Sequence, residues 1–178
     1  MNLTDLHRRL LRDVLDIGSI AAALADELSA RGWQVRKIEA DPLSARMMVS
    51  DRATEESCEV DVLKEAFYHA PEVTEYGPVL ALEDVIGTKV RALADRGAAR
   101  DLIDVRAASS LYGTADLENF GRRHARDEFR LEDLAARLDG AEWLDDGAFT
   151  AYGLTEDDVS DLRTWARASD DIASRVSA

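Results

Sequence analysis

The sequence contains little cysteine, few aromatic residues and no long hydrophobic run. Its single cysteine, Cys58, excludes an internal disulfide and a cysteine-based zinc site, and it predicts a reducing environment. No run of roughly 18 apolar residues occurs, so we expect no membrane-spanning helix and no membrane partner. The N-terminal residues also lack the apolar core and the cleavage site of a secretory signal. These absences predict a soluble cytoplasmic protein.

Basic residues are scarce as well. The chain has 22 Lys and Arg against 36 Asp and Glu, a net charge of −14, which disfavours non-specific binding to a polyanion and makes DNA an unexpected partner. Residues 141–161 contain acids but no Lys or Arg, and we interpret them as a solvated face in preference to a dock for a basic partner. Residues 82–106 hold five acids and five bases, so a phosphate-handling surface is expected there.

The first part of the chain predicts helices followed by a small sheet. With 46% hydrophobic residues among its 178, the protein can bury a core. Helical spacing predicts an N-terminal helix capped by Thr4, an interruption at Gly18-Ser19, and a second helix that stops at Gly32. Short strands are expected at residues 33–39, 45–50 and 58–63. Consecutive short strands predict an antiparallel meander packed against helices.

The second part of the chain is predicted to be helical. Pro71 and Gly77-Pro78 indicate a loop, and Gly97 is expected to turn the chain between two helices that form a hairpin. Helical periodicity occurs at residues 82–95, 98–111, 115–127, 131–138 and 156–176. The expected fold class is α+β, with an α+β half at residues 1–76 and a helical half at residues 77–178.

The strand at residues 58–63 is the most informative short segment. Alternation directs Cys58, Val60 and Val62 toward a core and places Glu59 and Asp61 together on the opposite face. Two carboxylates this close on a rigid strand can hold a divalent metal through oxygen ligands. A strand with one solvated face explains the same pattern, and on spacing alone it is the simpler interpretation.

The predicted helix hairpin brings a second set of charges together. Lys89 and Asp104 lie about equally far from Gly97, so antiparallel packing should place them at one level. Arg96 follows on the flank of Lys89, and Asp101 precedes Asp104 by one helical turn. Such a lysine and acid can bind a triphosphate and orient a nucleotide, but without further information a structural ion pair between two helices is the simpler interpretation.

The histidines and tryptophans give weaker signals. His7, His69 and His124 are scattered and have no spacing typical of metal ligands, so no histidine metal site is expected. Trp33 and the two other tryptophans are interpreted as packing residues.

The order of these segments resembles the AbiEii/AbiGii-type nucleotidyltransferase toxins, of the DNA polymerase β-like nucleotidyltransferase superfamily. The resemblance is carried by residues 77–93, with the sequence GPVLALEDVIGTKVRAL, and by the Arg-Asp-x-x-Asp motif at residues 100–104. The strand Glu59-Val60-Asp61-Val62 is similar to the family's Val-Asp-Leu strand. The resemblance implies a polymerase β-type sheet with flanking helices.

The resemblance also implies an activity. Members transfer a nucleoside monophosphate from an NTP to an acceptor hydroxyl with Mg²⁺ (or Mn²⁺), and the acceptor is an RNA, tRNA included, or another molecule. It implies that Asp61, with Glu59 beside it, binds the metal and that Lys89 holds the NTP phosphates. Asp104 would complete the catalytic set, with Arg96 and Asp101 at the nucleotide. A cognate antitoxin is the implied protein partner.

One motif of that family is absent from this sequence. The family opens with a Gly-Gly/Ser turn that leads to an Asp-x-Asp strand with two metal-binding carboxylates. Here Gly18-Ser19 runs directly into Ile20-Ala21-Ala22-Ala23. We therefore expect the chain as printed to be catalytically impaired, with deletion or omission of a segment as the economical explanation. The alternative function is a non-catalytic scaffold of the same fold that binds a partner protein.

Overall fold

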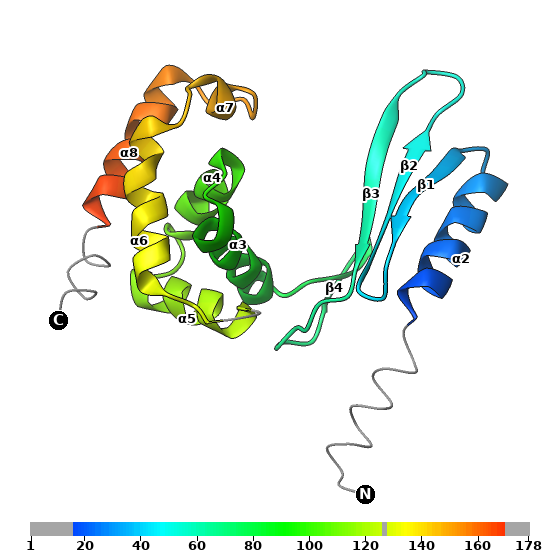
Figure 1. Ribbon diagram of the computed structural model, residues 1–178, viewed down its shortest axis with the longest axis horizontal. Helices are drawn as coiled ribbons and strands as arrows, with labels where there is room; N and C mark the ends of the chain where they lie inside the picture. Colours follow the sequence, from blue (N-terminus) through cyan, green and yellow to red (C-terminus); the bar gives the residue numbers. More distant parts are fainter. Residues whose placement is uncertain (1–15, 126–127, 170–178) are drawn as a thin grey trace, which may run out of the picture. The chain divides into compact units, whose positions relative to one another are not determined.

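The computed structural model describes residues 16–125 and 128–169, so the predicted helix capped by Thr4 lies outside the described residues. The chain divides into two compact units, residues 1–66 and residues 67–178. The first unit is named here the sheet unit and the second the helical unit (Figure 1).

The sheet unit contains a three-stranded antiparallel meander and a helix. The helix α2 spans Ile17–Ala30, and the strands are β1 (Gln34–Ala40), β2 (Ser44–Ser50) and β3 (Ser57–Leu63), in the order β1-β2-β3. Both strand pairs are antiparallel, with a shift of register in β1 between Lys37 and Glu39. The predicted meander is confirmed.

The helix α2 covers one face of the sheet. Alternate residues of β2, Ala45, Met47 and Val49, are buried in a cluster with Ile17, Ala21 and Ala25 of α2. The intervening residues of β2 lie on the opposite face, because successive side chains of a strand alternate. That opposite face carries Arg46, Glu59 and Asp61, as the cross-strand register requires.

Two predictions for this unit were wrong. Gly18-Ser19 does not interrupt a helix but lies in the first turn of α2, because the Asp16 side chain accepts the backbone N–H groups of both residues. Cys58 is not part of the core: it shares the face of β3 that carries Val60 and Val62, but it is exposed near the start of the strand, whereas Val60 and Val62 pack against the core as expected.

The predicted loop around Pro71 and Gly77-Pro78 is a small hairpin. Strands β4 (Glu72–Thr74) and β5 (Gly77–Val79) pair antiparallel as a separate two-stranded sheet. The Thr74 hydroxyl closes the turn by donating to the carbonyl of Gly77 at 2.8 Å. A proline is tolerated here because β5 is an edge strand.

The rest of the helical unit is a bundle of helices (Figure 1). Its longer helices are α3 (Leu82–Arg96), α4 (Ala99–Ala108), α5 (Thr114–His124), α6 (Leu131–Asp139) and α8 (Glu156–Ala168). The predicted hairpin is confirmed: Gly97 closes α3 in the left-handed conformation, with φ of 63°. Two short elements that the sequence did not predict are the 3₁₀ turn Gly140–Trp143 and α7 (Gly147–Thr150).

One extended apolar core holds these helices together. Val90, Leu93, Leu102 and Phe149 are fully buried in it. The helix α3 packs on α5 at Gly87, where a Cβ atom would come within 2.7 Å of the carbonyl oxygen of Phe120. The two helices can therefore approach closely only because residue 87 has no side chain. No helix among the described residues is long and apolar enough to cross a membrane.

Candidate functional site

Lys89 and Asp104 lie side by side on the two helices of the hairpin. The Lys89 Nζ atom is 2.7 Å from an Asp104 carboxylate oxygen, and the two side chains are 38% and 40% exposed. The predicted juxtaposition is confirmed. An ion pair at this exposure contributes little to stability, about 0–1 kcal/mol, so both groups remain available to a ligand.

This ion pair borders a pocket of about 210 Å³ between α3 and α4. Apart from Lys89 and Asp104, the lining is apolar and comes from Leu82, Val85, Ile86, Ala107, Ala108 and Leu111. An apolar pocket with a few convergent polar groups is the usual form of a small-molecule site. The pocket is smaller than most such sites, and Lys89 presents a cation at its border.

Arg96 and Asp101 form the closing contact of the hairpin turn. The guanidinium of Arg96 donates two hydrogen bonds, of 2.7 and 2.8 Å, to the carboxylate of Asp101. Asp101 is fully buried, and the hydrogen bonds that Arg96 donates to it raise the pKa of Arg96. Asp101 and Asp104 thus take different partners, although they were predicted to face alike. The two-hydrogen-bond contact between Arg96 and Asp101 links the end of α3 to the start of α4 across the Gly97 turn.

The strand carboxylates share a cation across the sheet. Arg46 on β2 bonds Asp61 on β3 at 2.7 Å and 3.2 Å, and its Nε atom lies 3.4 Å from Glu59. The hydrogen bond to Asp61 is the main cause of a raised pKa of Arg46. Glu59 and Asp61 do share one exposed face as predicted, but an arginine opposite them neutralises part of their charge. Arg46 was not among the predicted site residues, and the cross-strand register is the signal that identifies it.

Within residues 16–125 and 128–169, no group of three or more His, Cys, Asp or Glu side chains is placed to hold a metal ion. Asp61 and Glu59 belong to the sheet unit, whereas Lys89, Arg96, Asp101 and Asp104 belong to the helical unit. Within the sheet unit Glu59 and Asp61 lie together, and within the helical unit Lys89 pairs with Asp104 and Arg96 with Asp101. Two carboxylates suit Mg²⁺ that is bound together with substrate phosphates, because this ion keeps few protein ligands.

A buried acid that sequence reasoning missed organises the start of the helical unit. Asp84, 1% exposed, accepts hydrogen bonds from the backbone N–H groups of Tyr68 and His69 at 2.9 to 3.2 Å. Its side chain also contacts the His124 Nε2 atom at 2.9 Å and the His69 Nδ1 atom at 3.3 Å. Two of the three scattered histidines thus meet at one carboxylate.

The environment of Asp84 favours its ionised form. Burial by itself would raise the pKa of Asp84, but the backbone N–H groups of His69 and Tyr68 and the side chains of His124 and His69 together lower it. Asp84 anchors the segment before α3 to α5, and it lies five residues before Lys89 in the same helix. We assign it a positioning role on these contacts.

Comparison with known proteins agrees with the sequence resemblance. Residues 29–168 match the family model described as nucleotidyl transferase AbiEii toxin, type IV TA system. A crystal structure of an H. pylori protein described as a nucleotidyltransferase covers 81% of this chain and 67% of its own, at 18% identity and a TM-score of 0.46. No match was found among the curated proteins. Since the family model spans most of the sequence, the chain belongs to the AbiEii family of nucleotidyl transferase toxins of type IV toxin–antitoxin systems.

Proposed function

We propose that this protein binds a nucleoside triphosphate in the α3–α4 hairpin and serves the transfer of a nucleoside monophosphate to a hydroxyl of RNA, tRNA included. The observation that carries the proposal is the accessible Lys89–Asp104 pair at 2.7 Å, beside an apolar pocket within the family-matched residues. In such a transfer the acceptor hydroxyl gives up its proton and its oxygen forms a bond to the α-phosphorus. The bond between the α-phosphorus and the oxygen bridging to the β-phosphate breaks, and pyrophosphate leaves with that oxygen.

The residues of the hairpin have separate parts in this proposal. Lys89 leaves Asp104 and binds the triphosphate, to whose oxygens its compact, positively charged ammonium group donates hydrogen bonds. Asp104, released from Lys89, is free to accept hydrogen bonds from the sugar or the base. Arg96 and Asp101 hold the turn, so that the two helices keep Lys89 and Asp104 at one level.

The family implies Mg²⁺ (or Mn²⁺), and the strand carboxylates are its proposed ligands. Asp61 and Glu59 would hold it within the sheet unit, after Arg46 has given up its bonds to them. The ion supplies charge neutralisation at the transferring phosphate when it is bound. With two carboxylates where the family has more, slow transfer is expected.

The test measures transfer directly. The full chain is incubated with Mg²⁺, total RNA and each of the four NTPs labelled at the α-phosphate, beside Lys89→Gln and the matched control Lys37→Gln. We expect label on RNA for the wild type and for Lys37→Gln, and its loss in Lys89→Gln. No label with any NTP, in protein shown to be folded, would contradict the transferase.

A second candidate function is a non-catalytic scaffold that binds its antitoxin. It is favoured by the Arg46 bonds to Asp61, which occupy the strand carboxylates, and by the lack of a three-ligand metal group among the described residues. A stable complex with the cognate antitoxin, together with no labelling of RNA, would select this candidate. Labelling of RNA would reject it.

A further inference from the structure

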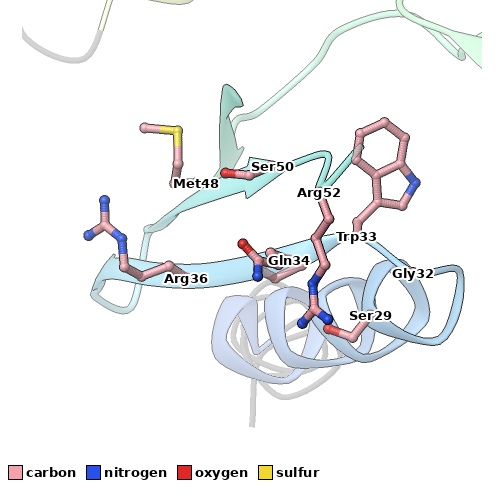
Figure 2. A pocket seen from close by; sticks show the side chains of 9 residues that line it. Ser29, Gly32, Trp33, Gln34, Arg36, Met48, Ser50 and Arg52 are labelled. Atoms are coloured by element: carbon pink, nitrogen blue, oxygen red, sulfur yellow. The ribbon is translucent and has the colours of Figure 1, made fainter. Parts of the chain in front are cut away.

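A second pocket lies in the sheet unit, where the end of α2 meets the first two strands (Figure 2). Its volume is about 580 Å³, within the range of small-molecule sites. Polar and aromatic side chains dominate the lining: Ser29, Trp33, Gln34, Arg36, Ser50 and Arg52. No acidic residue lines it. In a chain of net charge −14, two arginines without an acid in one pocket are unusual.

The cations of this pocket are free to bind a ligand. Among the described residues, the side chains of Arg36 and Arg52 make no hydrogen bond or ion pair, and neither does the side-chain amide of Gln34. Arg46 on the same sheet, by contrast, is taken up by Asp61 and Glu59. An unpaired guanidinium keeps all its donors available, and its planar fork matches the oxygens of a phosphate.

The backbone around the pocket is already fixed. Gln34 and Arg36 are alternate residues of β1, so their side chains share one face of the strand. The turn that carries Arg52 is closed by Asp51, whose carboxylate accepts a backbone N–H two residues further on at 2.7 Å. The backbone N–H of Trp33 donates a hydrogen bond to the carbonyl of Leu28 in α2 at 3.1 Å. A ligand would therefore meet a preformed frame.

Trp33 adds an aromatic surface to these donors. It was expected to be a packing residue, but it is 42% exposed and borders the pocket at the end where Arg52 extends toward Ser29 (Figure 2). Arg36 lies at the opposite end, beyond Gln34. An exposed indole stacks on any base, an amide bonds a base edge, and guanidinium groups bind phosphate.

We propose that this pocket binds a nucleoside phosphate, with its phosphate on Arg36 or Arg52 and its base on Trp33. The nucleotide unit is either a free mononucleotide or one residue of an RNA strand, since both present the same chemistry. The negative net charge favours recognition of a single unit over a long polyanion. No residue of the Lys89–Asp104 pocket lines this one, so the inference does not depend on the proposed triphosphate site.

Titration of the full chain tests the inference. Binding is measured by calorimetry. The probes are AMP, UMP and single-stranded tetramers of A and of U. Adenosine and inorganic phosphate, the two halves of AMP, are titrated separately. Arg36→Gln, Arg52→Gln and Trp33→Leu are compared with Lys37→Gln, an exposed lysine of the same strand that does not line the pocket. Each pocket variant should weaken binding about tenfold, as expected for loss of a charge-assisted or stacking contact, while Lys37→Gln should not.

Each outcome decides a point. Equal affinity for mononucleotide and tetramer supports a free nucleotide, and tighter tetramer binding supports an RNA strand. Binding retained in Lys89→Gln separates this pocket from the proposed triphosphate site. Absence of binding by all nucleotide probes, the same loss in Lys37→Gln as in Arg36→Gln, or inorganic phosphate binding as tightly as AMP would overturn the inference.

Discussion

The two units of the protein use their charged side chains differently. In the helical unit, cations meet acids inside the unit, as in the pairs Lys89–Asp104, Arg96–Asp101 and Arg163–Asp146. In the sheet unit, Arg31 and Arg46 are paired, but the side chains of Arg36 and Arg52 make no such bonds among the described residues. Charges that a fold leaves unpaired at a pocket are available to ligands, whereas paired charges must first exchange a partner. The comparison therefore separates groups that can bind a ligand directly from groups that must first release a partner, as Lys89 must release Asp104.

The cores of the two units differ as well. The helical unit buries large side chains completely, among them Leu93, Leu102 and Phe149. The core of the sheet unit consists mostly of small residues of α2 and β2, with Met47 as its largest fully buried side chain. The helical unit should thus provide most of the apolar stabilisation, because the free energy gained scales with the apolar area buried.

Removal of the largest buried side chain should have the strongest effect. Phe149→Ala is expected to lower the free energy of unfolding of the helical unit by about 3–5 kcal/mol, through lost burial and a residual cavity. Urea denaturation measures this loss. Phe67→Ala, at a position 43% exposed in the same unit, is the control and should cost less than about 1 kcal/mol. Equal losses would contradict the assignment of the core.

The Asp84 cluster should make the helical unit sensitive to acid. At neutral pH, Asp84→Asn should cost about 1–3 kcal/mol, because buried N–H and imidazole groups lose their anionic partner. The pKa of Asp84 is lower in the folded than in the unfolded protein, so its contribution is complete above the unfolded value of about 3.9. The contribution disappears as the pH falls through the folded-state pKa.

The measurement is the stability difference between wild type and Asp84→Asn from neutral to acid pH. We expect this difference to be constant at neutral pH and to narrow in acid. Asp161→Asn, at an exposed position of α8, serves as the control and should be nearly neutral throughout. A difference that does not change with pH would refute the ionised state of Asp84.

The close packing of α3 on α5 predicts a contrast between two glycines. Gly87→Ala should destabilise the helical unit by about 1–3 kcal/mol, since its Cβ atom would overlap the His124 ring and the Phe120 carbonyl. Gly140→Ala adds the same atom in open space and should change stability by less than about 1 kcal/mol. Thermal unfolding of the two variants provides the test, and similar melting temperatures would argue against the packing described.

The smallest effect is expected at the strand carboxylates. Arg46→Gln should change the free energy of unfolding by less than about 1 kcal/mol, because Arg46 and Asp61 are both partly exposed and solvent screens their attraction. Denaturation in low and high salt measures this change, with Arg31→Gln, which removes an exposed ion pair at the C-terminal end of α2, for comparison. A loss of unfolding free energy well above about 1 kcal/mol would show that Arg46 stabilises the fold and does not simply occupy the strand carboxylates in place of a ligand.

Much of the secondary structure could be predicted from local patterns. Alternation and turn residues indicated the meander, and the apolar spacing of α3 with Gly97 after it indicated the hairpin. The same symmetry about Gly97 located Asp104 opposite Lys89. These features depend on residues close in sequence or on a simple count from a turn, which is why the sequence alone was sufficient.

Contacts between distant residues could not be predicted in this way. Asp84 meets His69 and His124 across 15 and 40 positions, and nothing in the spacing of the histidines indicates a shared partner. Arg46 reaches Asp61 only once the strand register is known. Gly18-Ser19 was misread because a cap by Asp16 allows glycine and serine in a first helical turn.

The most direct test of the central claim is the binding of nucleoside triphosphate at Lys89. Calorimetric titration of the full chain with each NTP and Mg²⁺ would compare wild type, Lys89→Gln and Lys37→Gln. The proposed function predicts binding to the wild type and to Lys37→Gln, with affinity lowered about tenfold or more in Lys89→Gln. Equal affinity in all three proteins, or no binding in any, would contradict it.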